Sequence, residues 1–293
     1  MNRFLYLFVY IPALLLALFP FRVLYFISGF FYLIIYYIVR YRRKLVWKNL
    51  NNAFPEKTPE EIRKIEKDFY LHFCDYFVET IKLLHISDSQ MQERFVFKNI
   101  EPLQHYLDKQ QPVVLFLGHY GNWEWITSIT LHLKSNGNII FGQVYRPLRN
   151  KTFDRFFLHL RKRFHSVGFT KHNVYRDIVG LRKANKNWII GFMSDQKPSG
   201  NQVPHQMLFL NQETSVLTGT EKIARKTGAV VCYLDISCLK RGYYEVYAHI
   251  ISDNAADTSE FEITEKYIRC LEQTILKKPS AYLWTHNRWR LKS

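Results

Sequence analysis

The first 39 residues constrain the fold of this chain more than any other segment. They contain only two charged residues, Arg3 and Arg22, and consist largely of two apolar runs of 17 residues each, 4–20 and 23–39. A helix needs about 20 residues to cross the hydrocarbon core of a bilayer, so each run is just short of spanning length. The segment is therefore predicted to bind a membrane, either as one tilted span with one interfacial helix or as a shallow hairpin.

Charge predicts which side of the membrane the rest of the chain occupies. Residues 1–44 carry six cations and no acidic residue, and four of those cations lie in 40–44, directly after the apolar runs. Juxtamembrane cations mark the cytoplasmic face and attract anionic lipid. No small-residue cleavage site follows the first run, which disfavours a removed signal peptide. We expect a membrane anchor over 1–44 and a cytoplasm-facing domain over 45–293.

The remainder is predicted to be an α/β domain with a mostly parallel central sheet flanked by helices. Thr58-Pro59-Glu60-Glu61 is typical of a helix start, and apolar residues at three- and four-residue spacing continue that helix to about His85. Short apolar runs then alternate with helical stretches, and Gly242 suggests a hairpin between the last two strands. The expected strands are 113–117, 139–144, 188–193, 230–236 and 243–251, and the expected helices are 122–135, 151–164, 174–185, 216–227 and 260–276.

Composition narrows the class of partner and of chemistry. Lys and Arg number 41 against 25 for Asp and Glu, a net charge of +16 that favours lipid headgroups, nucleic acid or an acidic protein. No nucleic-acid-binding module is recognisable, and such a function would leave the anchor unexplained. The cysteines have neither CxxC nor metal-ligand spacing, so no metal site is predicted and they are expected to be reduced core residues. They are Cys74, Cys232, Cys238 and Cys270.

The segment 112–125 carries the candidate chemistry. A buried strand is expected to end at Gly118, which places His119 at a strand's carboxyl end, where open α/β sheets bind ligands. Asn122 is a favourable helix-starting residue. His119 and Glu124 can meet only if His119 lies in the turn before that helix. A carboxylate on one imidazole nitrogen supports the cation formed when the other takes a proton, so the pair is interpreted as a general base, with a structural role as the alternative.

The sequence around His119 resembles the His-x4-Asp/Glu block of the lysophospholipid acyltransferase superfamily. Within it, the chain resembles the lipid A biosynthesis (lauroyl/myristoyl) acyltransferases. A Phe-Pro-Glu-Gly-type block is absent, which favours a glycolipid acceptor over glycerol phosphate. The matching blocks, in chain order, are Tyr41-Arg42-Arg43-Lys44 with Asn49-Leu50 and Ala53-Phe54-Pro55, then Gly118–Glu124, Val144-Tyr145-Arg146-Pro147 with Asn150, Ser194-Asp195-Gln196, and 282–289.

The resemblance implies direct acyl transfer at the bacterial inner membrane. His119 would act as general base on a hydroxyl of a lipid A precursor, and Glu124 would orient it, with Asn122 among the substrate-binding residues. The oxygen would attack the thioester of an acyl carrier protein or of coenzyme A, with no cofactor and no acyl-enzyme. The chain agrees in having no GxSxG motif. Acceptors that stay open are another glycolipid, an aminolipid or a lysophospholipid, and a non-catalytic membrane-tethered lipid-binding protein is the alternative of another class.

Three further residues at strand ends are predicted to bind substrate. Arg146 and Arg149 follow the strand 139–144, and guanidinium groups suit an acceptor phosphate or the phosphate of the donor's pantetheine. A solvated basic loop is the alternative. Asp195 follows the strand 188–193 and is expected to bind the acceptor or support the site, unless it only forms a turn. The basic surface suits an acidic acyl carrier protein and a phosphorylated glycolipid.

Overall fold

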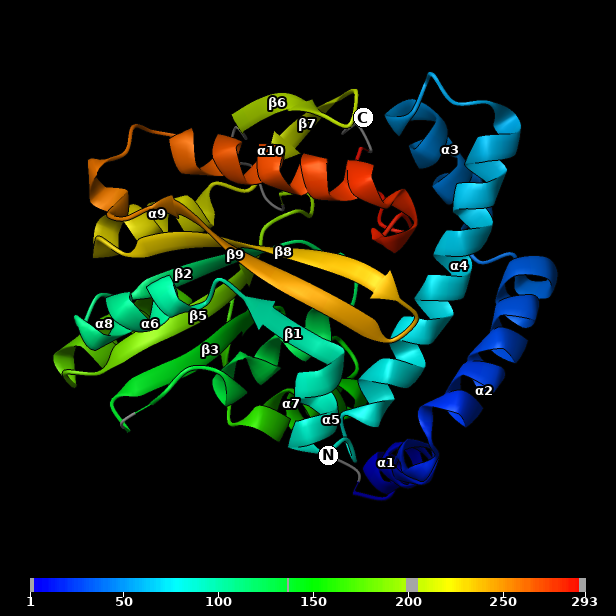
Figure 1. The fold of residues 1–293 in the computed structure, drawn as a ribbon, viewed down its shortest axis with the longest axis horizontal. Helices are drawn as coiled ribbons and strands as arrows, with labels where there is room; N and C mark the ends of the chain where they lie inside the picture. Colours follow the sequence, from blue (N-terminus) through cyan, green and yellow to red (C-terminus); the bar gives the residue numbers. More distant parts are fainter. Residues whose placement is uncertain (1–2, 136, 199–204, 290–293) are drawn as a thin grey trace.

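A seven-stranded sheet forms the centre of the protein (Figure 1). The computed structural model describes residues 3–135, 137–198 and 205–289. The strand order is β1-β9-β8-β2-β5-β3-β4, parallel throughout except that β8 and β9 form an antiparallel hairpin. The predicted α/β class and the hairpin are confirmed. The strands are β1 (Phe95–Lys98), β2 (Val113–Leu117), β3 (Ile139–Tyr145), β4 (Val167–Thr170), β5 (Asn187–Met193), β8 (Val230–Lys240) and β9 (Tyr243–Ser252).

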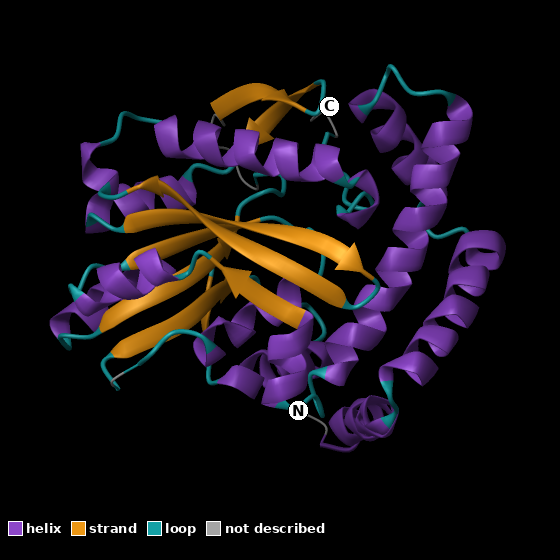
Figure 2. Cartoon of the chain, viewed as in Figure 1, coloured by secondary structure: helices purple, strands orange, loops and turns teal. Residues whose placement is uncertain are grey.

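Helices cover both faces of the sheet, as Figure 2 shows. The central strand β2 is buried along its whole length, which explains why it is a continuous apolar run. A short antiparallel pair, β6 (His205–Phe209) and β7 (Gln212–Val216), lies beside α10. The helices of the domain are α3 (Arg43–Ala53), α4 (Pro59–Lys82), α5 (Asp88–Arg94), α6 (Glu101–Asp108), α7 (Lys151–Arg161), α8 (Val174–Lys183), α9 (Gly219–Thr227) and α10 (Glu262–Lys277).

The segment expected to be a helix over 122–135 is a shorter 3-10 helix, η2 (Trp123–Leu131). Hydroxyl groups explain the tighter winding. Ser128 donates to the carbonyl of Trp125 at 2.7 Å, and Thr127 and Thr130 each donate to the carbonyl three residues earlier. Such side-chain bonds compete with the α-helical pattern.

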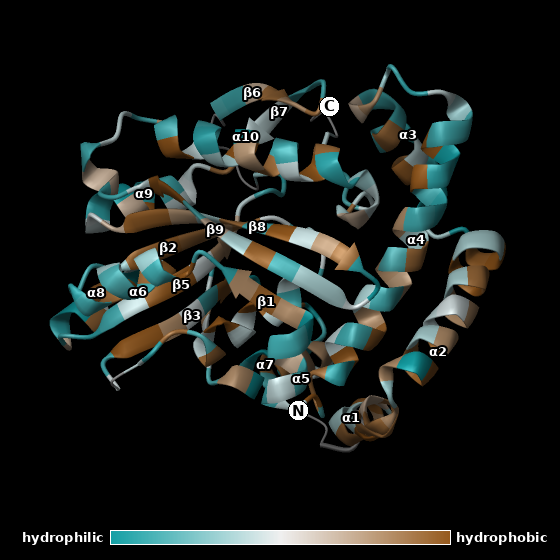
Figure 3. Cartoon of the chain, in the orientation of Figure 1, coloured by the Kyte–Doolittle hydropathy of each residue, from teal (hydrophilic) through white to brown (hydrophobic). Residues whose placement is uncertain are grey.

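The apolar N-terminal segment is helical and packs against the domain. Helix α1 (Arg3–Leu18) is followed by α2 (Phe21–Leu33), which continues as one π-helical stretch, η1 (Ile34–Val39). By length and composition, Phe21–Val39 is able to cross a membrane, and 17% of that window is buried. Helix α2 runs along α4, and hydrophobic residues occupy much of α1 and α2 (Figure 3).

Candidate active site

A cavity of about 830 Å³ opens at the carboxyl ends of β2, β3 and β5. Its wall includes His119, Glu124, Arg146 and Arg149, so four of the six predicted site residues lie around one space. The position agrees with the rule that parallel sheets bind ligands beyond the carboxyl ends of their strands. The cavity is the candidate active site.

His119 is paired with a buried aspartate. Its Nδ1 lies 2.7 Å from Oδ1 of Asp195, and its backbone N–H donates to Oδ2 at 3.2 Å. On the other side of the ring, the Gln196 amide nitrogen lies 3.2 Å from Nε2. This pattern assigns the neutral ring a proton on Nδ1 and leaves the Nε2 lone pair toward the cavity. The imidazole is therefore prepared to accept a proton at Nε2.

The Asp195 carboxylate stays ionised although it is 2% exposed. Burial alone would raise its pKa. The charge and hydrogen bonds of His119, helped by the charge of Arg288, outweigh burial and lower the pKa of Asp195 to about 2. A charged carboxylate at Nδ1 stabilises the imidazolium that forms when Nε2 takes a proton. Asp195 thus has the geometry expected of the carboxylate that orients a general base.

The predicted contact between Glu124 and His119 is not formed among the described residues. The Glu124 carboxylate instead accepts two hydrogen bonds from Arg161 of α7, at 2.6 and 2.8 Å. A carboxylate that is 3% exposed needs a partner for its charge, and the planar fork of a guanidinium provides it. The ring of Trp123 packs against His119, with 5.2 Å between ring centroids. The roles of His119 and Glu124 in catalysis stay predictions.

The sheet register explains why Asp195 is the partner. Strands β2 and β5 are parallel neighbours, and Leu117 pairs with Met193 at their ends. His119 and Asp195 each follow two residues later, so the register places them side by side. The sequence did contain a signal for this pairing, because His119 and Asp195 each lie two residues past the end of a strand. The signal is readable only when β2 and β5 are known to be neighbours.

The C-terminal segment 281–286 holds the backbone of the His119 turn. Leu283 donates its N–H to the carbonyl of His119 at 3.0 Å. Arg42 and Asn49 of the N-terminal part donate side-chain hydrogen bonds to carbonyls of the same segment. Two sequence blocks more than 230 residues apart, noted above only for their resemblance, thus meet behind the candidate base.

Arg288 lies behind the same turn. The side chain is 4% exposed and stacks over Phe209 at 5.1 Å, and its guanidinium nitrogens have no hydrogen-bond partner within the part of the chain that the structure describes. Its charge helps to keep Asp195 ionised.

The cavity wall is rich in cations. Arg146 and Arg149 are exposed on the loop after β3, where the sequence placed them. Arg161, Lys171 and Lys197 also line the cavity, and sequence reasoning did not single them out. They follow different elements, so only the fold brings them together. A wall of this charge favours anionic groups in the cavity.

Comparison with known proteins identifies the family. The family model for the bacterial lipid A biosynthesis acyltransferases matches residues 1–291. The chain belongs to this family. It is therefore an acyltransferase. It is 22% identical over 257 residues to the lipid A biosynthesis palmitoleoyltransferase of Escherichia coli (strain K12), covering 85% of this chain and 79% of the relative. The lipid A biosynthesis acyltransferase of Shigella flexneri matches with the same identity and coverage.

Asn122 does not line the cavity of this lipid A acyltransferase. The residue is fully buried, and its amide donates to Glu79 Oε2 at 2.8 Å, so its observed contact is structural and its role in substrate binding stays a prediction. Glu79 also accepts hydrogen bonds from Tyr25 of α2 and Tyr244 of β9, at 3.0 and 2.8 Å. Trp125 of the same block donates its indole N–H to the Glu79 carbonyl. Asn122 therefore fixes the turn that carries His119 to the helix α4.

Glu79 gives the acyltransferase a predictable pH dependence of stability. Burial raises the pKa of Glu79 from 4.5 to about 7, although the hydrogen bonds from Asn122 and the tyrosines act against burial. Between these two values the folded state keeps a proton that the unfolded state has lost. Stability therefore falls as the pH rises through this window, by at most about 1.4 kcal/mol per pH unit from this group.

Glu79→Gln is expected to remove this contribution, because the amide does not titrate. Chemical denaturation of wild type and of Glu79→Gln across pH 4.5 to 7 gives two curves of unfolding free energy against pH, and the difference in their slopes measures the contribution of Glu79. The exposed Glu260→Gln is the matched control and leaves the slope unchanged. Parallel curves for wild type and Glu79→Gln would show that the folded-state pKa of Glu79 is ordinary.

The remaining expectations concern cysteines and metals. All four cysteines are free; Cys74 and Cys232 are buried and the other two are half-buried. Within the described ranges, no cluster of three or more His, Cys, Asp or Glu side chains is placed to hold a metal ion.

Proposed function

We propose that this acyltransferase moves a fatty acyl chain from a thioester to a hydroxyl of a phosphorylated lipid A precursor, with His119 as general base and Asp195 as the residue that orients it. The 2.7 Å contact between His119 and Asp195, at the wall of a cationic cavity, is the observation that carries the proposal. Family membership supports the acyl transfer itself.

The reaction uses the Nε2 lone pair of His119, where the acceptor hydroxyl would replace the Gln196 amide that contacts Nε2 at 3.2 Å. Nε2 takes the proton of the acceptor hydroxyl while its oxygen attacks the carbonyl carbon of the thioester. Collapse of the tetrahedral intermediate breaks the carbon–sulfur bond, and the leaving thiolate takes the proton back from the imidazolium. An ester and a free thiol result. The protein forms no covalent intermediate and the reaction needs no cofactor.

The cavity offers different surfaces for the two substrates. Arg146, Arg149 and Arg161 suit the phosphates of the acceptor and of the donor's pantetheine arm. Apolar side chains of the same wall, among them Phe157 and Ile223, suit the acyl chain. Either acyl carrier protein or coenzyme A presents such an arm, and the net charge of +16 favours the acidic carrier protein.

Glu124 has a different role in this proposal from the one its spacing suggested. Because the carboxylate is bound to Arg161, it holds that guanidinium at the cavity wall rather than orienting the imidazole. Glu124 is therefore a positioning residue for a cation that faces the substrate. The domain is proposed to act at the cytoplasmic side of a bacterial inner membrane, where its thioester donors are made.

Mass spectrometry of lipids tests the proposal. Cells that lack the gene are expected to contain lipid A lighter by one acyl chain, and wild type but not His119→Ala restores the mass. His105→Ala, a substitution at an exposed histidine of α6, is the control and restores it fully. If lipid A is unchanged and another glycolipid or an aminolipid is altered instead, that lipid is the acceptor, and the assignment to a lipid A precursor is overturned. Purified enzyme with matched acyl-carrier-protein and coenzyme A thioesters identifies the donor.

A further inference from the structure

Large apolar side chains are exposed on the outer side of the N-terminal helices. We call this surface the apolar face and define it by Phe8, Ile11 and Leu15 of α1 and by Phe26, Phe30 and Ile38 of α2 and η1. Phe8, Phe26 and Ile38 are 77%, 81% and 75% exposed. So large an apolar patch on one side of a protein marks a contact with lipid or with another protein.

The opposite side of α2 is fixed to the domain by buried polar contacts. Ser28 donates to Asp75 of α4, and Arg241 of the β8–β9 turn binds the same carboxylate with two hydrogen bonds, at 2.6 and 2.7 Å. Arg241 also donates to the carbonyl of Tyr25, whose hydroxyl donates to Glu79 at 3.0 Å. The middle of α2 is thus attached through charged groups that belong to the domain.

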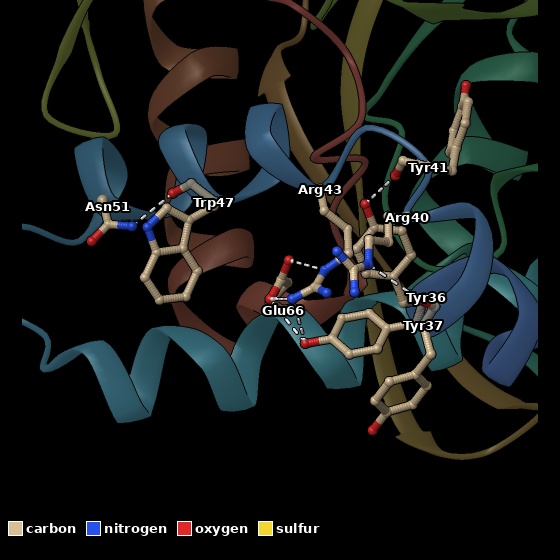
Figure 4. A network of polar contacts seen from close by, with 9 residues as sticks. Tyr36, Tyr37, Arg40, Tyr41, Arg43, Trp47, Asn51 and Glu66 are labelled. Atoms are coloured by element: carbon tan, nitrogen blue, oxygen red, sulfur yellow. Dashed lines mark hydrogen bonds and ion pairs between the residues drawn. The ribbon is translucent and has the colours of Figure 1, made fainter.

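The end of the apolar segment is attached in the same way (Figure 4). The Tyr36 hydroxyl of η1 donates to Glu66 of α4 at 3.0 Å, and Arg43 binds the same carboxylate at 3.0 and 3.2 Å. The guanidinium of Arg43 also lies 4.0 Å from the centre of the Tyr36 ring. Glu66 is 1% exposed, so its charge depends on these partners.

Helix α1 is held by the domain at both ends. Lys82, at the end of α4, donates to the carbonyls of Ala17 and Phe19 at 2.7 and 2.9 Å. Nearer its start, the guanidinium of Arg155 of α7 lies 4.3 Å from the centre of the Tyr6 ring, and at mid-helix Tyr10 packs edge-on against His159. The helices α1 and α2 therefore form one layer on the side of the domain (Figure 1), and the exposure of Phe8, Phe26 and Ile38 places the apolar face on its outer side.

A helix that crosses a bilayer has hydrocarbon around it at mid-depth. Here α4 runs beside α2 and η1, and it carries Glu66, Asp75 and Glu79 on the buried side and further charged residues on its exposed surface, such as Lys67 and Asp68. A transmembrane α2 would take these charges into the hydrocarbon or would break their contacts, and both are expensive. These contacts between α2–η1 and α4 therefore allow a membrane only on the outer side of the two N-terminal helices, away from the domain.

We infer that α1 and α2–η1 do not span the bilayer but lie in one leaflet of an anionic membrane, with the apolar face in the acyl region. The charges around the face fit this occupant. Arg22, Arg40 and Lys44 are exposed beside it, and no acidic residue occurs before Glu56. Basic residues beside an apolar helical face bind anionic headgroups. Of the two arrangements that the sequence allows, the structure favours the shallow hairpin.

Labelling of single cysteines tests the topology. In the full-length protein, Arg22→Cys is introduced at the start of α2 and Lys44→Cys just after η1. A membrane-impermeant maleimide is then applied to spheroplasts and to inverted vesicles. A helix in one leaflet exposes both positions only on the cytoplasmic side. Wild type corrects for native thiols, and the exposed domain position Lys183→Cys is the control. Labelling of Arg22→Cys from the periplasmic side would overturn the inference.

Vesicle binding tests the occupant of the apolar face. Phe26→Asp with Ile38→Asp is expected to reduce partition of the purified protein into phosphatidylethanolamine–phosphatidylglycerol vesicles by about tenfold or more, since two exposed apolar side chains that would enter the acyl region are lost. Leu239→Asp is the matched control, since Leu239 is 58% exposed outside the face, and it leaves binding unchanged. Circular dichroism verifies the fold of each variant. Equal binding of both variants would assign the face to another partner. Neither assay uses an acyl donor or acceptor, so their outcome is independent of the proposed reaction.

Discussion

Replacing Asp195 by Asn is expected to lower the rate of acyl transfer by about 10²–10⁴-fold, the usual contribution of a general base. Asn has the shape of Asp but no charge, and its amide is able to donate to Nδ1 of His119. That bond favours the ring with a proton on Nε2, which removes the lone pair that faces the acceptor. The observed 2.7 Å contact would then hold the wrong tautomer.

The measurement is a radiolabelled acyl-transfer assay on the purified enzyme in detergent, with thermal unfolding as the test of fold. His119→Ala and the His119→Ala, Asp195→Asn double variant complete the cycle. If the two residues act as one unit, the double variant is no slower than the slower single variant. A rate for Asp195→Asn within threefold of wild type would show that Asp195 has no part in proton transfer.

Removing Arg161 is expected to destabilise the protein strongly. Arg161→Met keeps most of the side-chain volume but leaves the Glu124 carboxylate, 3% exposed, without its two charged hydrogen bonds. Breaking a buried ion pair by removing one partner costs about 3–5 kcal/mol. Urea denaturation of the detergent-solubilised protein measures the loss as a lower midpoint.

The double variant Arg161→Met, Glu124→Gln separates the free energy of the ion pair from the contributions of the two side chains taken singly. Because it removes both charges, it is expected to recover much of the lost stability. A loss below about 1 kcal/mol for Arg161→Met would place the pair among the weak surface ion pairs instead. In the acyl-transfer assay, equal losses for Glu124→Gln and Arg161→Met would agree with a carboxylate that acts through the guanidinium.

The central strands were predictable because burial on both faces leaves a continuous apolar run. The β2 run was predicted at its observed bounds, Val113–Leu117, and β3, β5 and β9 at nearly their observed bounds, whereas β8 extends four residues beyond its predicted end at Ile236. Strands β1 and β4 were missed because each has only four residues and alternates between buried and more exposed side chains, and the pair β6–β7 was not predicted either. The turn around His119 was also predicted, and Gly121 adopts a φ of +59° there, which favours glycine.

The partner of the candidate base was not predictable from local spacing. His119 and Asp195 are 76 residues apart, and only the pairing of β2 with β5 brings them together. Glu124 was the nearest carboxylate in the sequence, but the chain gives no sign that Arg161, 37 residues later, binds it. Likewise, the pattern of α4 indicated an apolar stripe and did not reveal that Glu66, Asp75 and Glu79 are buried beside it. Long-range polar pairs depend on the fold, and local patterns do not encode them.

The contacts of Glu79 have a practical consequence for anyone who wants to produce this enzyme. Truncation at the N-terminus is a common way to obtain a soluble fragment, but here it would delete Tyr25 and Ser28 from the partners of Glu79 and Asp75. Both carboxylates are nine-tenths buried or more, and one of them holds Asn122 in the turn next to His119. A fragment without the first two helices would therefore have a disturbed turn at the candidate active site and a newly exposed apolar surface along α4. Expression should keep the whole chain and supply it with detergent or lipid.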